Sequence, residues 1–273
     1  MIPTTMRYAI DVAPLGDLAD PAAIVRLAVA AERAGWDGLS TWDVLGISMG
    51  APSADPFVAL AAVASATARL RLIASVVALP RRRPQLVAQA AATLDRWSGG
   101  RLVLGIGAGG DPGDFTAFGE SFEPKERLAR FDRDALVIDG YLRGAGGMAI
   151  GPRPAQHPRP PIWVGGMRPG ALRRAARWDG WIAIAVTDDG SAMNLSADAF
   201  ATMVGRLGDE RATAGYGGAP FDVAVFGFSD PSGADLVGAF AAAGATWWLE
   251  SLSPLRGSLD ELLARVHAGP PAS

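Results

Sequence analysis

Hydrophobic positions along the chain alternate between short continuous runs and longer segments with helical spacing. In the segment 84–97 the apolar side chains recur at intervals of three and four residues, which places them on one helix face: Leu86, Val87, Ala90 and Leu94. Pro84 suits the first turn of this helix, and Gly99 supplies the left-handed residue that ends it. The next run, 102–104, is continuously apolar, which is typical of a strand buried on both faces.

The same alternation continues over the whole sequence. Short apolar runs predict eight strands, at residues 8–12, 38–42, 70–79, 102–104, 161–165, 180–184, 221–226 and 246–249. Between and after them we expect eight helices, at residues 21–34, 56–68, 84–97, 125–142, 169–177, 197–214, 235–243 and 259–267. A strand–helix alternation of 273 residues closes as a parallel barrel more readily than it forms an open sheet. We therefore predict an α/β fold, a TIM-type (β/α)8 barrel, as a single domain over residues 1–273.

Charge and composition narrow the function classes. With 25 basic and 28 acidic residues the net charge is −3, which does not suggest a nucleic-acid or anionic-membrane partner. The absence of cysteine excludes disulfides and thiolate chemistry. Asp11 interrupts the only stretch that could begin a signal peptide, and no apolar run is long enough to cross a membrane. We expect a soluble cytoplasmic protein. Its two histidines, His157 and His267, lie away from the strand ends, so we expect neither a metal site nor a Ser-His-Asp triad.

In a barrel of this kind the ligand lies at the carboxyl ends of the strands. There, the segment from Gly105 to Gly110 matches the G-x-G-x-x-G pattern of dinucleotide-binding folds. In those folds the glycines lead directly into a helix, whereas here the segment 111–114 continues the loop. We interpret the glycines as a place where the backbone can approach a flat ring; the alternative is that they only serve the turn.

A second glycine pair follows the strand at 161–165. Gly165 and Gly166 precede Arg168 and the helix-starting Pro169, an arrangement that favours a phosphate through free N–H groups and a positive helix end. The alternative is an ordinary loop. The arginines 81–83 resemble a phosphate site too, but we interpret them as a solvated face or as partners of carboxylates. Four aromatic residues either wall an apolar pocket or belong to the core: Trp42, Phe115, Phe118 and Trp181.

Several motifs together resemble one family. They are AERAGWDGLSTWD (31–43), PRRRPQLVAQAAATLDRWSGGRLVLGIGAGG (80–110), PPIWVGG (160–166) and LRRAARWDGW (172–181). This set, in this order, is similar to the bacterial luciferase-like flavin- and deazaflavin-dependent oxidoreductases; from about residue 191 only the general pattern matches. The resemblance implies a (β/α)8 barrel that binds FMN or the deazaflavin coenzyme F420 in its mouth.

The resemblance also implies which residues hold the cofactor. It places Asp43 beside the ring and makes Ser75-Val76 a bulge behind it, often with a non-prolyl cis peptide. The stretch Gly107, Ala108 and Gly109 corresponds to the loop over the edge of the ring. The ribityl-phosphate chain corresponds to Gly165, Gly166 and Met167, with Arg168 close by. A substrate pocket would then be lined by Trp42, Val44, Phe115 and Trp181.

Two departures from the family pattern affect the expected chemistry. Val44 stands where many relatives have histidine, and Gly110 stands where deazaflavin-dependent dehydrogenases have glutamate. Without these groups the base needed to oxidise an alcohol is missing, which leaves Asp43 as a candidate. We therefore expect a monooxygenase that uses reduced FMN and oxygen on a small organic substrate, served by a separate flavin reductase. The alternatives are F420-dependent hydride transfer and a non-catalytic flavin-binding protein. Relatives are commonly homodimers.

Overall fold

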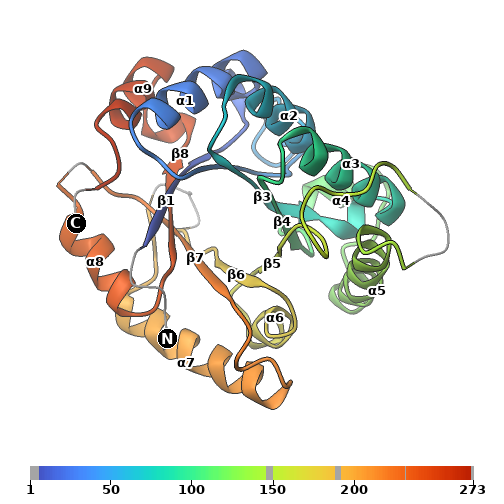
Figure 1. Ribbon diagram of the computed structural model, residues 1–273. Coiled ribbons are helices and arrows are strands. Elements are labelled where there is room, and N and C mark those ends of the chain that lie inside the picture. Colours follow the sequence, from blue (N-terminus) through green and yellow to red (C-terminus); the bar gives the residue numbers. More distant parts are fainter. Residues whose placement is uncertain (1–5, 146–149, 188–191, 231, 272–273) are drawn as a thin grey trace.

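Eight parallel strands form the centre of the protein. The computed structural model describes residues 6–145, 150–187, 192–230 and 232–271. The strands pair in chain order and close into a barrel (Figure 1). Their bounds are β1 Arg7–Val12, β2 Gly38–Thr41, β3 Arg71–Ala78, β4 Leu102–Gly107, β5 Ile162–Gly165, β6 Gly180–Ala183, β7 Asp222–Gly227 and β8 Trp247–Leu252. The predicted TIM-type barrel is confirmed.

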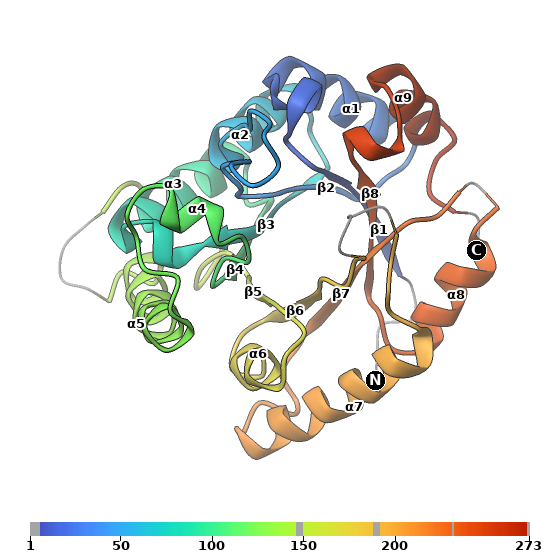
Figure 2. The same cartoon turned by 180° about the vertical axis from the view of Figure 1, so that it is seen from behind.

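Helices surround the strands on the outside, as Figure 2 shows from the opposite side. They are α1 Pro21–Arg33, α2 Pro56–Ala66, α3 Pro84–Trp97, α4 Gly113–Thr116, α5 Pro124–Leu142, α6 Pro169–Ala175, α7 Ala197–Thr213, α8 Ala234–Ala242 and α9 Leu259–His267. Short 3-10 turns are η1 Gly16–Ala19, η2 Leu79–Arg81 and η3 Pro254–Arg256. The eight expected helices are present within a few residues of their predicted bounds, while α4 and the 3-10 turns were not expected. No helix of the described residues is both long and apolar enough to cross a membrane.

Helix α3 has the predicted bounds, but one of its apolar residues does not lie on the buried face. Pro84 begins it, and Gly99 ends it with a φ of 69°. The prediction that Leu86 shares the buried face is wrong, because Leu86 is 58% exposed. The buried stripe runs through Val87, Ala91 and Leu94, and Leu86 is turned about 100° from Val87 around the helix axis.

The barrel interior changes from apolar to polar towards the carboxyl ends of the strands. Its lower part is filled by large rings such as Trp163 and Trp247, whose centroids are 5.8 Å apart. On β1, Asp11 follows the apolar Ala9 two residues later, so both point to the same side. On β3, Ser75 follows Ile73 in the same way. We call the ring of strand ends and following loops the barrel mouth.

Candidate functional site

Asp43 joins the loops after β2 and β3. Its side chain is 2% exposed and accepts hydrogen bonds from Arg82 at 2.8 Å on each oxygen and from the amide of Ala78 at 3.0 Å. Arg81 lies 3.2 Å from Oδ1 and also donates to the Asp43 carbonyl at 2.7 Å. Each carboxylate oxygen therefore already has two partners. The structure does not favour Asp43 as a catalytic base, because its oxygens serve to hold these loops in place.

Two of the three arginines after β3, Arg81 and Arg82, have carboxylate partners, and Arg83 is exposed, so each of the two interpretations from the sequence holds for part of the cluster. Arg81 contacts Asp114 at 3.3 Å, and Arg82 contacts Asp55 at 2.8 Å. Although burial lowers the pKa of Arg82, its hydrogen bonds and charge interactions with Asp43 and Asp55 raise it overall. These side chains stabilise the first half of the barrel mouth and are not available to an anion.

The bulge on β3 lies against two glycines of the neighbouring strands. The Ser75–Val76 peptide is cis, and the register shifts between Ala74 and Val77, as the resemblance implied. The side chain of Val76 fills the space where a Cβ of Gly107 on β4 or of Gly165 on β5 would stand; the second would approach Val76 to 2.7 Å. Glycine at both positions thus allows β3, β4 and β5 to present a close-packed wall at the mouth.

The glycine motif after β4 is not part of a dinucleotide-binding fold. The sheet is closed, and β4 leads into a loop that contains only the four-residue α4. Gly109 has a φ of 78°, and a Cβ there would lie 2.9 Å from the ring of Phe115. Phe115 is 2% exposed beneath this loop. The prediction that Phe115 lines an open pocket is therefore wrong: its ring supports the loop from below.

The loop after β5 offers fewer free N–H groups than the sequence suggested. The amide of Gly166 donates to Ile182 at 3.2 Å, and its carbonyl accepts from the indole of Trp181 at 2.7 Å. Gly166 has a φ of 132°, a conformation that favours glycine. Met167 packs partly against the core, and the exposed Arg168 caps the seven-residue α6. A helix this short contributes little to an anion site, so any affinity for phosphate must come from side chains.

Arg127, on the first turn of α5, supplies such a side chain. Its guanidinium lies 3.7 Å from the ring centroid of Phe122 and 5.9 Å from that of Phe115, below the β4 loop. Its Nε and Nη1 are buried without a hydrogen-bond partner within the described chain. Burial and the nearby positive charge of Arg168 lower the pKa of Arg127. Arg127 and Arg168 repel each other, and Arg127 has buried donors without an acceptor among the described residues. An anion bound between them would supply the acceptor and offset the repulsion.

Asp11 forms the polar centre of the barrel interior. It is fully buried; Oδ2 accepts from the indole N–H of Trp42 at 2.6 Å, and Oδ1 lies 3.3 Å from the hydroxyl of Ser75. The hydroxyls of Ser75 and Ser40 contact each other in turn. Burial raises the pKa of Asp11 to about 7, although the hydrogen bonds from Ser40, Trp42 and Ser75 lower it. This carboxyl therefore changes charge near neutral pH.

Of the other predicted pocket residues, Trp42 and Val44 lie at the mouth and Trp181 lies in the core. Trp42 is half-buried at the mouth, edge-on to Phe226 at 6.4 Å. Val44 is 8% exposed and packs in a small cluster with Ala13 and Leu15 beside Trp42. The prediction for Trp181 is wrong: it is fully buried and stacks on Phe200 of α7, in the layer between strands and helices.

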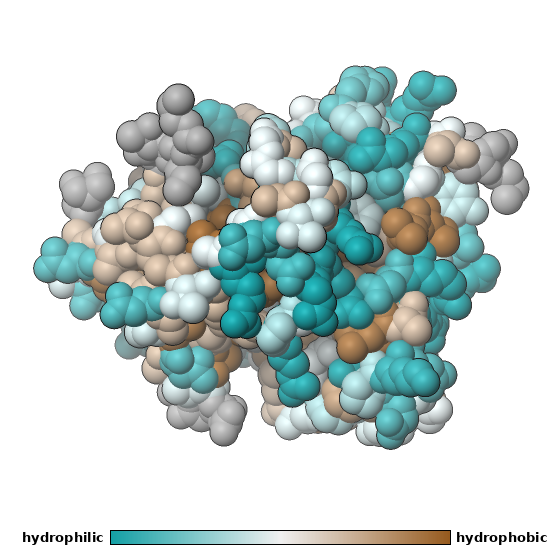
Figure 3. Space-filling model, turned by 90° about the horizontal axis from the view of Figure 1, so that it is seen from below, coloured by the Kyte–Doolittle hydropathy of each residue, from teal (hydrophilic) through white to brown (hydrophobic). Residues whose placement is uncertain are grey.

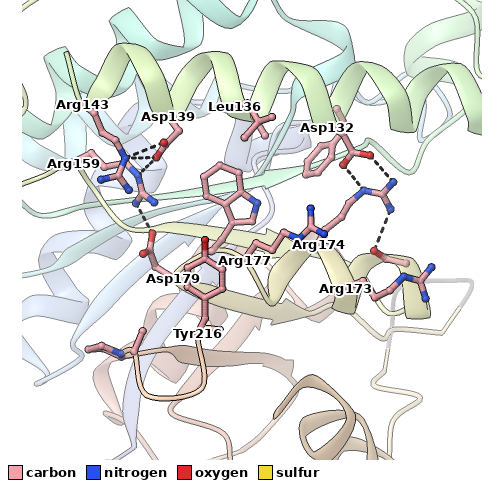
Figure 4. A pocket seen from close by; sticks show the side chains of 16 residues that line it. Asp132, Leu136, Asp139, Arg143, Arg159, Arg173, Arg174, Arg177, Asp179 and Tyr216 are labelled. Carbon is pink, nitrogen blue, oxygen red and sulfur yellow. Dashed lines mark hydrogen bonds and ion pairs between the residues drawn. The ribbon is translucent and has the colours of Figure 1, made fainter. Parts of the chain in front are cut away.

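A hollow lies outside the barrel, between α5 and α6. This flank groove of about 600 Å³ is shown in Figure 4. Arg174 binds Asp132 at 2.6 Å, and Arg159 binds Asp139 at 2.5 Å and also Asp179. Figure 3 shows a neighbouring face of the molecule, where hydrophilic side chains occupy the middle and hydrophobic ones form separate small patches. The groove is thus a charged feature, separate from the barrel mouth.

Comparison with known proteins assigns the chain to a family. The family model described as luciferase-like monooxygenase matches residues 3–228, which is most of the sequence. The chain belongs to the luciferase-like monooxygenase family. This family comprises flavin- and F420-dependent oxidoreductases, in agreement with the resemblance of the motifs.

The curated relatives of this luciferase-like protein match it over part of its length. An uncharacterized protein of Mycobacterium tuberculosis is 37% identical over 142 residues, which cover 49% of this chain and 49% of the relative. The chain thus spans about half the length of the curated relatives it matches.

Solved structures share the fold at low identity. The monooxygenase RslO1 from Streptomyces bottropensis has a TM-score of 0.76 at 20% identity, with 96% of this chain and 97% of that chain covered. The F420-dependent tetrahydromethanopterin reductase from Methanopyrus kandleri has a TM-score of 0.75 at 17% identity, with coverages of 97% and 98%. A diketocamphane monooxygenase component of Pseudomonas putida, in complex with FMN, has a TM-score of 0.65 at 17% identity, with coverages of 83% and 69%.

Two residues of this luciferase-like barrel were missed by sequence reasoning. Asp11 stood out only as a charge that interrupts an apolar start, and Arg127 was not singled out at all. The alternation along β1, which places Asp11 on the side of Ala9, was a signal that could have located Asp11 inside the barrel. Nothing in the local sequence distinguishes Arg127, whose setting depends on Phe115, Phe122 and Arg168.

Proposed function

We propose that this protein binds reduced FMN at the barrel mouth and uses it with oxygen to oxygenate a small organic substrate. The observation that carries the proposal is Arg127, whose Nε and Nη1 are buried without a hydrogen-bond partner among the described residues, near the positive charge of Arg168 and the glycines of the mouth. A phosphate would supply the acceptor oxygens that Arg127 lacks and the negative charge that the arginine pair lacks. Glycine at positions 107 and 165 leaves room for the side chain of Val76, which would form a flat apolar surface for the ring.

The residues of the chain would bind and orient the cofactor, which supplies the redox chemistry. When bound, reduced FMN provides two electrons and reacts with oxygen. Val76, between Gly107 and Gly165, gives the ring an apolar wall, and the half-buried Trp42 adds aromatic surface to the mouth. The ion pairs of Asp43 hold the surrounding loops, so that the site is formed before the cofactor enters.

F420-dependent hydride transfer is the second candidate, and one observation removes an argument against it. Sequence reasoning counted against hydride transfer to or from an alcohol because Val44 and Gly110 replace the usual proton-transfer groups. Asp11, with a pKa of about 7, is a carboxyl that can hold or release a proton near neutral pH. The same observation favours a catalyst over a non-catalytic flavin-binding protein. A separate flavin reductase and a homodimer remain predictions.

The test is a titration of the purified protein with FMN, riboflavin and F420, in oxidised and in anaerobically reduced form. Tighter binding of reduced FMN than of riboflavin is expected, because only FMN carries the phosphate. Arg127→Gln should weaken FMN binding by about tenfold or more, the value of a charge-assisted hydrogen bond, and leave riboflavin unchanged. Arg133→Gln, on the exposed side of α5, is the matched control and should alter neither.

Each outcome of this titration separates the candidates. Preference for F420 over FMN would replace oxygenation by hydride transfer. Equal affinity for FMN and riboflavin in the unmodified protein would contradict the phosphate assignment. Binding of neither cofactor would overturn the proposed function.

A further inference from the structure

The hydrogen bonds of Asp11 determine which of its oxygens can carry a proton. The indole N–H of Trp42 can only donate, so Oδ2, at 2.6 Å from it, must accept. A proton on this carboxyl therefore lies on Oδ1, which faces the hydroxyl of Ser75 at 3.3 Å. A hydroxyl accepts one hydrogen bond and donates another, so Ser75 can receive a proton from Asp11 while releasing its own.

No charged neighbour fixes the protonation state of Asp11. The groups that face it are Ser40 from β2, Trp42 directly after β2 and Ser75 from β3, and all three are neutral. On β8, Ser251 is its partner in register, while the adjacent Glu250 binds Arg256 at 2.5 Å instead. Burial and three hydrogen bonds account for the properties of this carboxyl, with no counter-ion among the described residues. A buried acid without a counter-ion is held neutral more easily than one in an ion pair.

The position of Ser75 connects this buried acid to the mouth. Ser75 immediately precedes Val76, whose side chain contacts the glycine positions of β4 and β5. A cofactor ring against that wall would lie next to Ser75, with Asp11 on the inner side of the hydroxyl. Asp11 itself is fully buried, and its hydrogen bonds with Ser75 and Trp42 connect it to the mouth.

We propose that Asp11 stores the proton consumed in the reaction and that Ser75 delivers it, a proposal that rests on the function proposed above. In the delivery step the O–H bond of Ser75 breaks as its proton passes to the ligand atom that has gained an electron pair. The proton on Oδ1 of Asp11 then forms a new O–H bond with Ser75, and Asp11 remains as a carboxylate. Solvent restores the proton between turnovers.

Either candidate chemistry requires such a proton. When a hydride reaches a carbon atom of a carbonyl, the oxygen gains the electron pair and takes up one proton. When reduced anionic flavin reacts with oxygen, one proton is likewise consumed on the way to water or hydrogen peroxide. Asp11 is therefore a proton-holding residue that acts through Ser75, and it does not decide between the cofactors.

The first experiment measures the protonation state of the Asp11 carboxyl in the protein without cofactor. Infrared difference spectra between pH 6 and pH 8 should show a protonated carboxyl that disappears as the pH rises. Asp11→Asn should remove that signal because it removes the carboxyl group. The amide keeps the shape and the hydrogen bonds of the neutral acid, so the fold should be unchanged. Asp95→Asn is the matched control, another fully buried aspartate, on α3 and bonded to Gln156. Its substitution should leave the signal in place, and absence of a signal that Asp11→Asn removes would overturn the proposal.

The second experiment measures delivery with reduced FMN and oxygen as probes. Reoxidation of bound reduced FMN should slow as the pH rises through about 7 in the unmodified protein. Asp11→Asn and Ser75→Ala should each slow it by about tenfold or more at low pH and flatten the pH profile. Ser75→Thr, which keeps the hydroxyl, should restore the profile. Ser253→Ala, which removes a buried hydroxyl without a partner, should not change it.

The outcomes keep the two proposals apart. An unchanged pH profile in Asp11→Asn, with FMN still bound, would overturn the role of Asp11 and leave the proposed function standing. If the protein binds F420 and not FMN, proton uptake on hydride transfer from reduced F420 replaces reoxidation, with the same variants and the same expectations.

Discussion

The barrel mouth and the flank groove both pair arginines with aspartates, but in different surroundings. At the mouth the side chain of Asp43 is 2% exposed and receives both Arg81 and Arg82. In the groove, Asp132 is 50% exposed and Asp139 21% exposed. A buried carboxylate must be fully matched by partners, whereas an exposed one is largely stabilised by water. The mouth pairs therefore determine geometry, whereas the exposed pair of Asp132 and Arg174 in the groove can be lost at little cost to the fold.

The largest expected effect is that of Asp43→Ala. This change leaves Arg81, with a side chain only 7% exposed, and Arg82 without their shared partner, so we expect about 3–5 kcal/mol of destabilisation. Asp132→Ala, which breaks the exposed pair with Arg174, should cost less than about 1 kcal/mol. Urea unfolding of the two variants measures both values. Similar losses at the two sites would contradict the comparison.

A smaller effect is expected where the mouth is packed most closely. Gly107→Ala introduces a methyl group into the space held by Val76, so we expect a loss of about 1–3 kcal/mol. The double variant with Val76→Ala should recover part of this loss, since the smaller side chain makes room. Unfolding of the single and double variants gives the coupling energy directly. Strict additivity would show that Val76 is not the cause.

The pH dependence of stability distinguishes the mouth from the groove as well. Folding raises the pKa of Asp11 from 3.8 to about 7, so the folded chain keeps a proton that the unfolded chain has released. The free energy of unfolding should therefore fall by about 2 kcal/mol from this group between pH 5.5 and pH 8, and level off above. Asp11→Asn should remove that fall. Asp132→Asn, in the groove, should retain it; a slope that persists in Asp11→Asn would contradict the assignment.

The smallest effect is expected for a cation of the groove. Arg177 is exposed next to Trp178, and no ion pair is found for it within the described residues. Arg177→Gln should change stability by no more than about 0.5 kcal/mol, visible as an almost unchanged melting temperature. A larger loss would mean that the groove depends on this charge in the way that the mouth depends on Arg82.

The sequence predicted the fold well because its signals are local. Proline, glycine and apolar spacing mark each end of α3 independently of the rest of the chain, and β4 is recognisable from three consecutive apolar residues. Eight such units leave few topologies other than a closed barrel. The error at Leu86 concerns the angle around the helix axis, which depends on the neighbours that the helix meets and not on its own sequence.

The candidate site was less predictable because its properties arise from several strands. Asp11 acquires its character from Ser40, Trp42 and Ser75, which are 29 to 64 positions away in sequence. Trp181 and Phe115 look alike as aromatic residues near strand ends, yet neither lines an open pocket, because the helices and loops that cover them are placed by tertiary packing. The bulge at Ser75-Val76 was located only through the resemblance to a family.

The bonds between the first loops of the mouth also bear on how this barrel can diverge. Asp43 joins the loops after β2 and β3, while Asp114 and Asp111 join the loop after β4 to Leu45 and Ser48. An insertion in any one of these loops would displace the others, so we expect the three loops to change together. Engineering of this scaffold should therefore exchange these three loops together and not one at a time.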